Sequence, residues 1–204
     1  IGQGYYLTNP LQLAVMAARL ATGRKLMPHL LVDPKRKSAP SLGFTDEHIT
    51  YVRAAMSEVV NGRGTAGRAR LPLDNALMAG KTGTAQVVSL SVSNGKRSAP
   101  WKYRDHGLFI CFAPFDNPRY ACAVVIEHGG GSGSAYPVAR DVLTFLYDRQ
   151  KALDVLAPME EAWGGSIEQR MAAKEEAYRA QRQAARATDN KESSIPAQEG
   201  SASG

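Results

Sequence analysis

The stretch Met78-Ala79-Gly80-Lys81-Thr82-Gly83-Thr84-Ala85-Gln86-Val87 decides how the rest of the chain is interpreted. It opens a run from Met78 to Leu90, rich in apolar residues and threonine, that predicts a β-strand. Successive side chains on a strand point to opposite faces, so Lys81 and Gly83 should share one face and the neighbouring threonines the other. Gly83 has no side chain, which lets a ligand lie flat against the strand. The stretch therefore combines a fold element with a candidate binding surface.

Two further strands are predicted downstream, from Gly107 to Phe115 and from Tyr120 to Glu127. The tetrapeptide Asp116-Asn117-Pro118-Arg119 lies between them and consists largely of turn formers, so the two strands should form an antiparallel hairpin. Both strands are apolar on both faces, which predicts that helices cover each side of the sheet. We therefore predict an α+β fold built on an antiparallel sheet with helices on both faces.

Three helices are predicted from capping residues and apolar periodicity. The first begins at Thr8-Asn9-Pro10, where Thr or Asn can cap and Pro suits the first turn, and it ends at Thr22-Gly23. The second begins after Thr45 and ends at Asn61-Gly62. The third, from Tyr136 to Tyr147, has the apolar spacing of a helix that packs on another element.

Charge and composition divide the chain of 204 residues into a body and a tail. The net charge is +6: up to Asp148 there are 17 Lys/Arg against 10 Asp/Glu, and from Arg149 onward there are 8 against 9. We predict that residues 149–187 are a charged, Ala-rich, partly helical extension and that residues 188–204 are a disordered tail. Residues 26–32 are predicted to be a short extended segment. No apolar run reaches the roughly 18 residues of a membrane-spanning helix.

The basic body suits three classes of partner, namely nucleic acid, an anionic membrane face and acidic polymers. A solvated surface is the simpler interpretation, because charged side chains are mostly exposed. The four histidines and the two cysteines, Cys111 and Cys122, do not have the spacing of metal ligands.

The predicted strand has the groups that a serine acyl-transfer site needs around its nucleophile. The Lys81 ammonium raises the local positive potential and favours an anionic substrate. The hydroxyls of Thr82 and Thr84 can donate to a carboxylate, and a backbone N–H beyond Gly83 can face an oxyanion while the ligand pairs as an added strand. By itself, a Lys-Thr-Gly triplet also occurs by chance in solvent-facing strands, so the surrounding sequence has to decide.

That surrounding sequence resembles a known family. Residues 79–86 resemble the third active-site motif of class B penicillin-binding proteins, the D,D-transpeptidases of peptidoglycan synthesis, and most closely the elongation-type branch, penicillin-binding protein 2. Order and spacing hold across residues 1–148. The other matching segments are Ile1-Gly2-Gln3-Gly4-Tyr5, Thr8-Asn9-Pro10-Leu11-Gln12, Asn61-Gly62-Arg63-Gly64-Thr65-Ala66, Arg104-Asp105-His106-Gly107-Leu108-Phe109, Ala113-Pro114, Asn117-Pro118 and Val125-Ile126-Glu127-His128-Gly129-Gly130.

The resemblance implies that residues 1–148 are the C-terminal portion of a penicillin-binding transpeptidase domain. It assigns substrate or β-lactam binding to Lys81, Thr82, Gly83 and Thr84. Lys81 would also belong to the electrostatic and proton network, and the backbone N–H of Thr84 would contribute to the oxyanion hole. The acylated serine with its lysine, and the second motif, are expected upstream of Ile1, so the chain alone should be inactive. No metal or organic cofactor is implied.

The implied partners are the D-Ala–D-Ala end of a peptidoglycan stem peptide, β-lactams, the upstream part of the same protein and the cell-wall elongation machinery, with no nucleic acid. The implied location is the periplasmic face of the inner membrane, with an N-terminal anchor outside this chain. Two alternatives remain. One is a β-lactam sensor or D,D-carboxypeptidase of the same fold, and the other is a non-catalytic module that acts through interactions.

Three other sequence patterns partly match known functional sites. Ser93-Asn94-Gly95-Lys96 fits a Ser-x-x-Lys pattern, but Asn-Gly forms turns and resists the helix that this pattern requires. Residues 80–82 end like a phosphate-binding loop, but a strand follows where a helix is required. Residues 129–133 are read as a flexible connection, because the Gly-x-Gly-x-x-Gly pattern fails at Ser134.

The predicted hairpin places Cys111 and Cys122 nearly opposite each other, where a disulfide is conceivable, although buried strand cysteines are usually small apolar side chains. His106 begins the second strand and either lies near the cleft or is a structural or surface histidine. Trp101, Tyr103 and the loop of residues 91–106 are candidates for a wall of the cleft.

Overall fold

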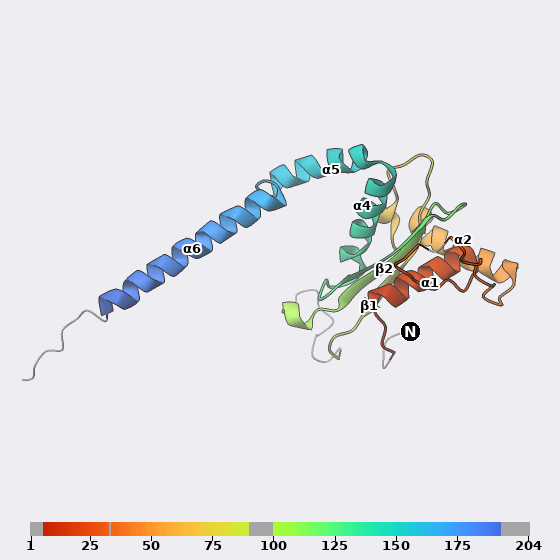
Figure 1. Cartoon of the computed structure of the whole chain (residues 1–204), viewed down its shortest axis with the longest axis horizontal. Helices are drawn as coiled ribbons and strands as arrows, with labels where there is room; N and C mark the ends of the chain where they lie inside the picture. Colours follow the sequence, from red (N-terminus) through yellow and green to blue (C-terminus); the bar gives the residue numbers. More distant parts are fainter. Residues whose placement is uncertain (1–5, 33, 90–99, 193–204) are drawn as a thin grey trace, which may run out of the picture. The chain divides into compact units, whose positions relative to one another are not determined.

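A computed structural model describes residues 6–32, 34–89 and 100–192. The chain divides into two compact units, Ile1–Ala152 and Leu153–Gly204. The first unit contains the sheet and the helices packed on it (Figure 1). The elements in chain order are α1 (Pro10–Thr22), α2 (Asp46–Asn61), the 3₁₀ helix η1 (Gly67–Ala69), β1 (Ala79–Ala85), η2 (Trp101–Tyr103), β2 (His106–Ala113), β3 (Tyr120–Ile126), η3 (Ser132–Ser134), α4 (Tyr136–Tyr147), α5 (Arg149–Ala162) and α6 (Ile167–Glu192).

The three strands form one antiparallel sheet in the order β1-β2-β3, so the predicted hairpin and the predicted α+β class are confirmed. β1 ends earlier than the predicted strand. Its last residue, Ala85, pairs with His106, the first residue of β2. Among the described residues, no strand pairs with the chain after Ala85, and Leu90 lies outside the described residues.

The local sequence signals for the helices are confirmed. The Asn9 side chain accepts from the Gln12 backbone N–H, the Gln12 side chain accepts from the Asn9 N–H, and Gly23 closes α1 with φ 67°. Thr45 caps α2 through its side-chain oxygen, which accepts from the His48 N–H. α4 has the predicted bounds. These caps satisfy backbone groups that a helix end otherwise leaves unpaired.

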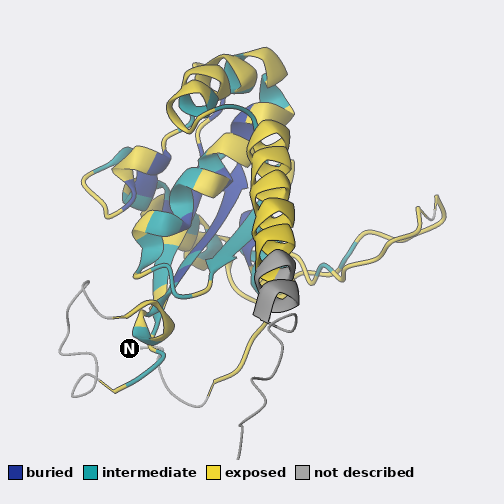
Figure 2. Cartoon of the chain, turned by 90° about the vertical axis from the view of Figure 1, so that its left-hand side faces the viewer, coloured by how far each residue is buried: buried dark blue, intermediate teal, exposed yellow. Residues whose placement is uncertain are grey.

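Helices cover both faces of the sheet, as predicted. α1 and α2 pack on one face, where Ala17, Ala21 and Met56 contact Ile110 and Phe112. α4 packs on the opposite face, where its residues join Phe109, Cys111 and the end of α2 in a second core cluster. Buried residues concentrate along the central strand, which is drawn dark blue in Figure 2. The sheet is therefore the middle layer of three.

One expectation about burial is wrong. β2 is buried from Phe109 to Ala113, but β3 is half-buried, because within the described chain it pairs with β2 alone and lies at the edge of the sheet. Residues 26–32, predicted to be a short extended segment, belong to no helix or paired strand. The only pairing in that region is an isolated bridge between Arg24 and Ser41, and Leu30 to Val32 are exposed.

The C-terminal part contains helix, as the sequence suggested. α5 crosses the boundary between the two units, and α6 is a charged helix whose described side chains are exposed. α6 continues to Glu192, past the predicted end of the helical extension at residue 187, and the rest of the predicted tail lies outside the described residues. Within the residues that the structure describes, every helix is too short or too polar to cross a bilayer.

Candidate functional site

The Lys-Thr-Gly-Thr segment lies on β1, and its side chains alternate as expected. Lys81 pairs with Ile110, which belongs to the core on the α1 and α2 side, whereas Thr82 pairs with Phe109 of the α4 side. Lys81 is exposed, and its Nζ donates to the backbone oxygen of Thr82 at 2.9 Å. β1 has β2 on one side only, and its other edge pairs with no strand within the described ranges, which leaves backbone groups for an added strand.

Thr65 is a site neighbour that the residue-level reasoning missed. Its Oγ1 lies 2.9 Å from Oγ1 of Thr82, so the two hydroxyls share a hydrogen bond. The loop that bears Thr65 is fixed where α2 ends, because the Asn61 amide donates to the Met78 oxygen at 2.9 Å. The Arg70 guanidinium donates to the oxygens of Val60 and Asn61 at 3.1 and 2.7 Å. Thr65 belongs to the family-like segment 61–66, so the sequence pointed to its neighbourhood. Only the fold shows that it contacts Thr82.

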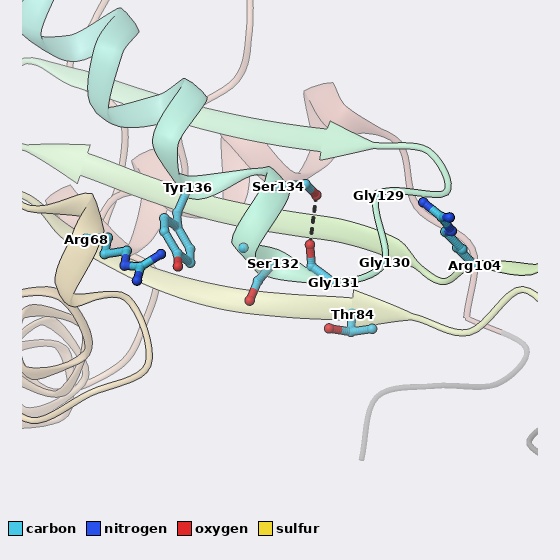
Figure 3. Close-up of a pocket in the computed structure, with 10 residues that line it drawn as sticks. Arg68, Thr84, Arg104, Gly129, Gly130, Gly131, Ser132, Ser134 and Tyr136 are labelled. Atoms are coloured by element: carbon cyan, nitrogen blue, oxygen red, sulfur yellow. Dashed lines mark hydrogen bonds between the residues drawn. The ribbon is translucent and has the colours of Figure 1, made fainter. Parts of the chain in front are cut away.

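A cavity of about 600 Å³ opens beside the end of β1 (Figure 3). The glycine stretch after β3, predicted to be a flexible connection, forms one wall of it. That stretch is held by backbone bonds, from the Gly129 N–H to the Ile126 oxygen at 3.2 Å and from the Gly130 N–H to the Asp105 oxygen at 2.8 Å. The lining residues are Arg68, Thr84, Arg104, Gly129, Gly130, Gly131, Ser132, Gly133, Ser134 and Tyr136.

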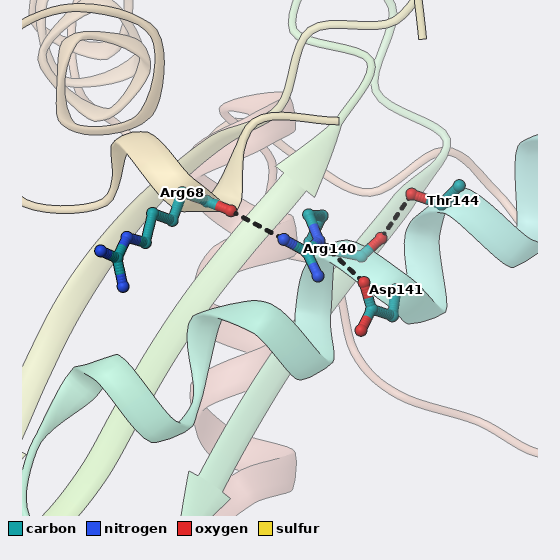
Figure 4. A network of polar contacts seen from close by, with 4 residues as sticks. All are labelled: Arg68, Arg140, Asp141 and Thr144. Carbon is teal, nitrogen blue, oxygen red and sulfur yellow. Dashed lines mark hydrogen bonds and ion pairs between the residues drawn. The ribbon is translucent and has the colours of Figure 1, made fainter. Parts of the chain in front are cut away.

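The cavity favours an anionic group, because its lining has the two guanidinium groups of Arg68 and Arg104 and no carboxylate. Arg68 is fixed through its backbone. The Arg140 guanidinium of α4 donates to the Arg68 oxygen at 3.3 Å and is itself paired with Asp141 at 2.7 Å (Figure 4). Thr144 donates to the Arg140 oxygen at 2.8 Å, which completes the network. This network ties η1 to α4 at the mouth of the cavity.

The two cysteines lie directly opposite each other on β2 and β3, as predicted, and both are free. The facing thiols shift each other's pKa in opposite directions through side-chain hydrogen bonding. This interaction lowers the pKa of Cys122 to about 7, whereas the same interaction and burial raise the pKa of Cys111. Neither cysteine lines the cavity, and both belong to the core on the α4 side of the sheet.

The structure places some of the remaining candidate site residues, and others lie outside the described residues. His106 lies at the start of β2 beside the last residue of β1, close to the motif. Trp101 packs on His128, with ring centroids 4.5 Å apart, and neither Trp101 nor Tyr103 lines the cavity. The Ser93–Lys96 pattern, residues 91–99 of the predicted wall, and the first family-like segment at residues 1–5 lie outside the described residues. Across ranges 6–32, 34–89 and 100–192, no three His, Cys, Asp or Glu side chains gather as metal ligands.

Replacing Gly107 with alanine should move the glycine wall. A Cβ at residue 107 would lie 2.1 Å from the Gly131 oxygen and 2.4 Å from the Ser134 Oγ, and the first of these is backbone. We expect a loss of about 1–3 kcal/mol of unfolding free energy, as for other overpacked sites, measured by denaturant titration. Gly67→Ala is the matched control, because a Cβ there meets nothing within 4 Å. Equal stability of the two variants would contradict the described packing.

Comparisons with known proteins agree with this geometry. The profile of the penicillin binding protein transpeptidase domain matches residues 1–144. Among curated proteins, the chain is 39% identical over 165 residues to the peptidoglycan D,D-transpeptidase MrdA of Acinetobacter baumannii, covering 74% of this chain and 24% of that protein.

Solved structures are similar as well. The chain superposes on penicillin-binding protein 2 (PBP2) of Helicobacter pylori, determined in complex with MreC, with a TM-score of 0.55 and 32% identity, covering 66% of this chain and 24% of that one. It also superposes on Pseudomonas aeruginosa PBP2 in complex with WCK 5153, with a TM-score of 0.51 and 34% identity, covering 72% and 31%. The chain spans about a quarter of the length of the curated relatives it matches.

Proposed function

Because the chain belongs to the penicillin-binding protein transpeptidase domain family, we propose that it is the substrate-holding part of a peptidoglycan D,D-transpeptidase that cross-links stem peptides during cell elongation. The observation that carries the proposal is the position of Lys81, Thr82 and Thr84 on an open strand edge that borders a cavity with a cationic lining. An open edge pairs an extended peptide, and the positive charge attracts its terminal carboxylate.

In the proposed reaction, a serine attacks the carbonyl carbon between the two D-alanines of a stem peptide. The tetrahedral intermediate collapses, the C–N bond breaks and D-alanine leaves with a proton on its amine. An amine of a neighbouring stem then attacks the ester and releases the serine. We place this serine on a part of the protein outside this chain. No step requires a metal or an organic cofactor.

The residues of this chain bind and orient the substrate in that scheme. The Thr82 and Thr84 hydroxyls donate to the substrate carboxylate, and the Lys81 ammonium stabilises the same negative charge. The Thr84 backbone N–H is proposed to donate to the oxyanion as it forms. Oγ1 of Thr65 lies 2.9 Å from Oγ1 of Thr82, and with Thr65 as the donor the Thr82 proton remains available for the carboxylate.

A fluorescent penicillin tests the proposal, because a β-lactam acylates the serine of such a site and leaves a stable ester. We expect covalent labelling of the whole protein, meaning this chain joined to the part that bears the serine, and none of the 204-residue chain alone. Labelling of this chain alone would show that the serine was placed wrongly. Absence of labelling in the folded whole protein would overturn the acyl-transfer proposal.

A second measurement separates the transpeptidase from a D,D-carboxypeptidase of the same fold. With a stem peptide as donor and an amine-bearing stem as acceptor, a transpeptidase forms a cross-linked product, whereas a carboxypeptidase only hydrolyses the donor. Mass spectrometry of the products distinguishes these outcomes. Hydrolysis without any cross-linked product would favour the carboxypeptidase.

We further propose that the protein works with the cell-wall elongation machinery on the periplasmic face of the inner membrane. The H. pylori PBP2 structure was determined as a complex with MreC, which supports a partner of that kind. Co-purification of the tagged whole protein with an MreC-like protein from crosslinked cells tests this. Recovery of the whole protein in the cytoplasmic fraction would contradict the location.

A further inference from the structure

His128 is the only residue other than glycine with a positive φ, 54°, in the part of the chain that the structure describes. A side chain with a Cβ rarely adopts this left-handed backbone, so such residues persist where the surroundings hold them, often beside a functional site. His128 lies two residues after the end of β3 at Ile126 and precedes Gly129, the first residue of the glycine wall. The conformation of His128 therefore sets the direction in which the wall leaves the sheet.

The imidazole of His106 accepts a hydrogen bond from the backbone of His128. The His128 backbone N–H donates to Nδ1 of His106 at 2.9 Å. A backbone N–H can only donate, so His106 Nδ1 must be free of a proton and its ring proton must lie on Nε2. The His128 ring has the opposite arrangement. Its Nδ1 lies 3.1 Å from the Arg104 oxygen, which can only accept, so this Nδ1 carries the proton.

The two rings also pack on each other. Their centroids are 4.9 Å apart in an edge-to-face arrangement, and the Trp101 ring also packs on His128, with centroids 4.5 Å apart. His106 is itself fixed, because it pairs with Ala85 at the end of β1. One residue further along, Gly107 pairs with Thr84, which lines the cavity. One short path of contacts therefore runs from the motif strand through His106 to the glycine wall, beside the backbone bonds of Gly129 and Gly130.

We propose that His106 is a positioning residue for the substrate-holding site. Its unprotonated Nδ1 accepts from the His128 N–H, keeps the left-handed backbone at residue 128 and so holds the glycine wall against Thr84. The hydrogen bond and the wall are features of the fold alone. The consequence for acylation rests on the function proposed above.

The structural arm of the test is amide hydrogen exchange in the whole protein, measured by mass spectrometry on peptides that cover residues 126–134. His106→Leu removes the acceptor but retains a ring-sized apolar group. We expect exchange in this segment to be at least about tenfold faster, because a local opening releases the protected N–H. His106→Asn places a side-chain oxygen near the Nδ1 position and should restore most of the protection. His48→Leu, on the exposed surface of α2, is the matched control.

The functional arm is the second-order rate constant of acylation by a fluorescent penicillin. We expect His106→Leu to lower it by about tenfold, since a displaced wall misplaces the bound ligand. His106→Asn should recover most of that loss, which a purely structural packing role for the ring would not allow. His128→Gly keeps the backbone donor and tolerates the positive φ, so it should lose less than His106→Leu.

The results of the two measurements test the positioning role of His106 and the proposed function separately. Unchanged exchange in His106→Leu, or no recovery with His106→Asn, overturns the positioning role. A larger loss in His128→Gly than in His106→Leu shows that the ring contacts hold the wall, and this also overturns it. If the penicillin never labels the wild type, the proposed function fails, while the exchange measurement still decides whether His106 holds the wall.

Discussion

Replacing Lys81 with alanine is expected to lower the rate constant for acylation of the whole protein by a fluorescent penicillin by about 100- to 1000-fold. The side chain supplies the positive charge on the open strand edge, next to the hydroxyls that would bind the ligand carboxylate. Its Nζ also donates to the backbone oxygen of Thr82 at 2.9 Å, so its loss frees the residue that Thr65 helps to orient.

Lys81→Ala should leave the fold intact. The side chain is exposed, and both of its hydrogen bonds go to the next residue. Surface substitutions of this kind usually change stability by less than about 0.5 kcal/mol, so the melting temperature should hardly move. Lys102→Ala is the matched control, since this lysine lies over the Tyr103 ring and outside the cavity lining. An acylation rate within a few-fold of wild type in Lys81→Ala would exclude the assigned role of the motif.

Replacing Phe109 with alanine should have the largest effect on stability, about 3–5 kcal/mol of unfolding free energy. Phe109 is 0% exposed and lies in the middle of the central strand. Its ring meets Tyr136 of α4 edge to face, with centroids 6.1 Å apart, and joins the core that also contains Met78 and Leu143. Its removal leaves a cavity between the sheet and α4, and the loss combines burial with the contacts around that cavity.

The measurement is a denaturant titration of the whole protein, in which the midpoint should fall while the slope stays constant. Phe44→Ala is the matched control, because Phe44 is 62% exposed and its truncation removes little buried surface. Phe109→Leu should cost less than Phe109→Ala, since leucine fills part of the space. Similar midpoints for Phe109→Ala and Phe44→Ala would contradict the described core.

The elements of the fold could be predicted wherever the signal is local. Asn9, Gly23 and Thr45 cap helices through backbone groups within a few residues of themselves, so the sequence contains the whole interaction. The turn at residues 116–119 likewise fixed the hairpin and the register that sets Cys111 opposite Cys122. The prediction that failed concerns a non-local property, because the burial of β3 depends on which strands flank it.

The residues of the candidate site also separate into those that local sequence predicts and those that depend on non-local contacts. Lys81, Thr82, Gly83 and Thr84 could be named from the sequence, because one strand and its alternation contain all four. The sequence did not reveal that Thr65 bonds Thr82 across a separation of 17 residues. It also did not reveal that the glycine stretch after β3 forms a wall of the cavity, where Gly107 on the neighbouring strand leaves room for its backbone.

The sequence by itself thus determined the helices, the strands, the family and the motif, because periodicity, caps and a contiguous motif are properties of short segments. Only the tertiary structure decided that the motif strand borders a cavity with a cationic lining, and that two histidines hold its glycine wall. The physical reason is that this site is assembled from η1, β1, β2 and the loop after β3, and their contacts exist only after the sheet brings distant segments together.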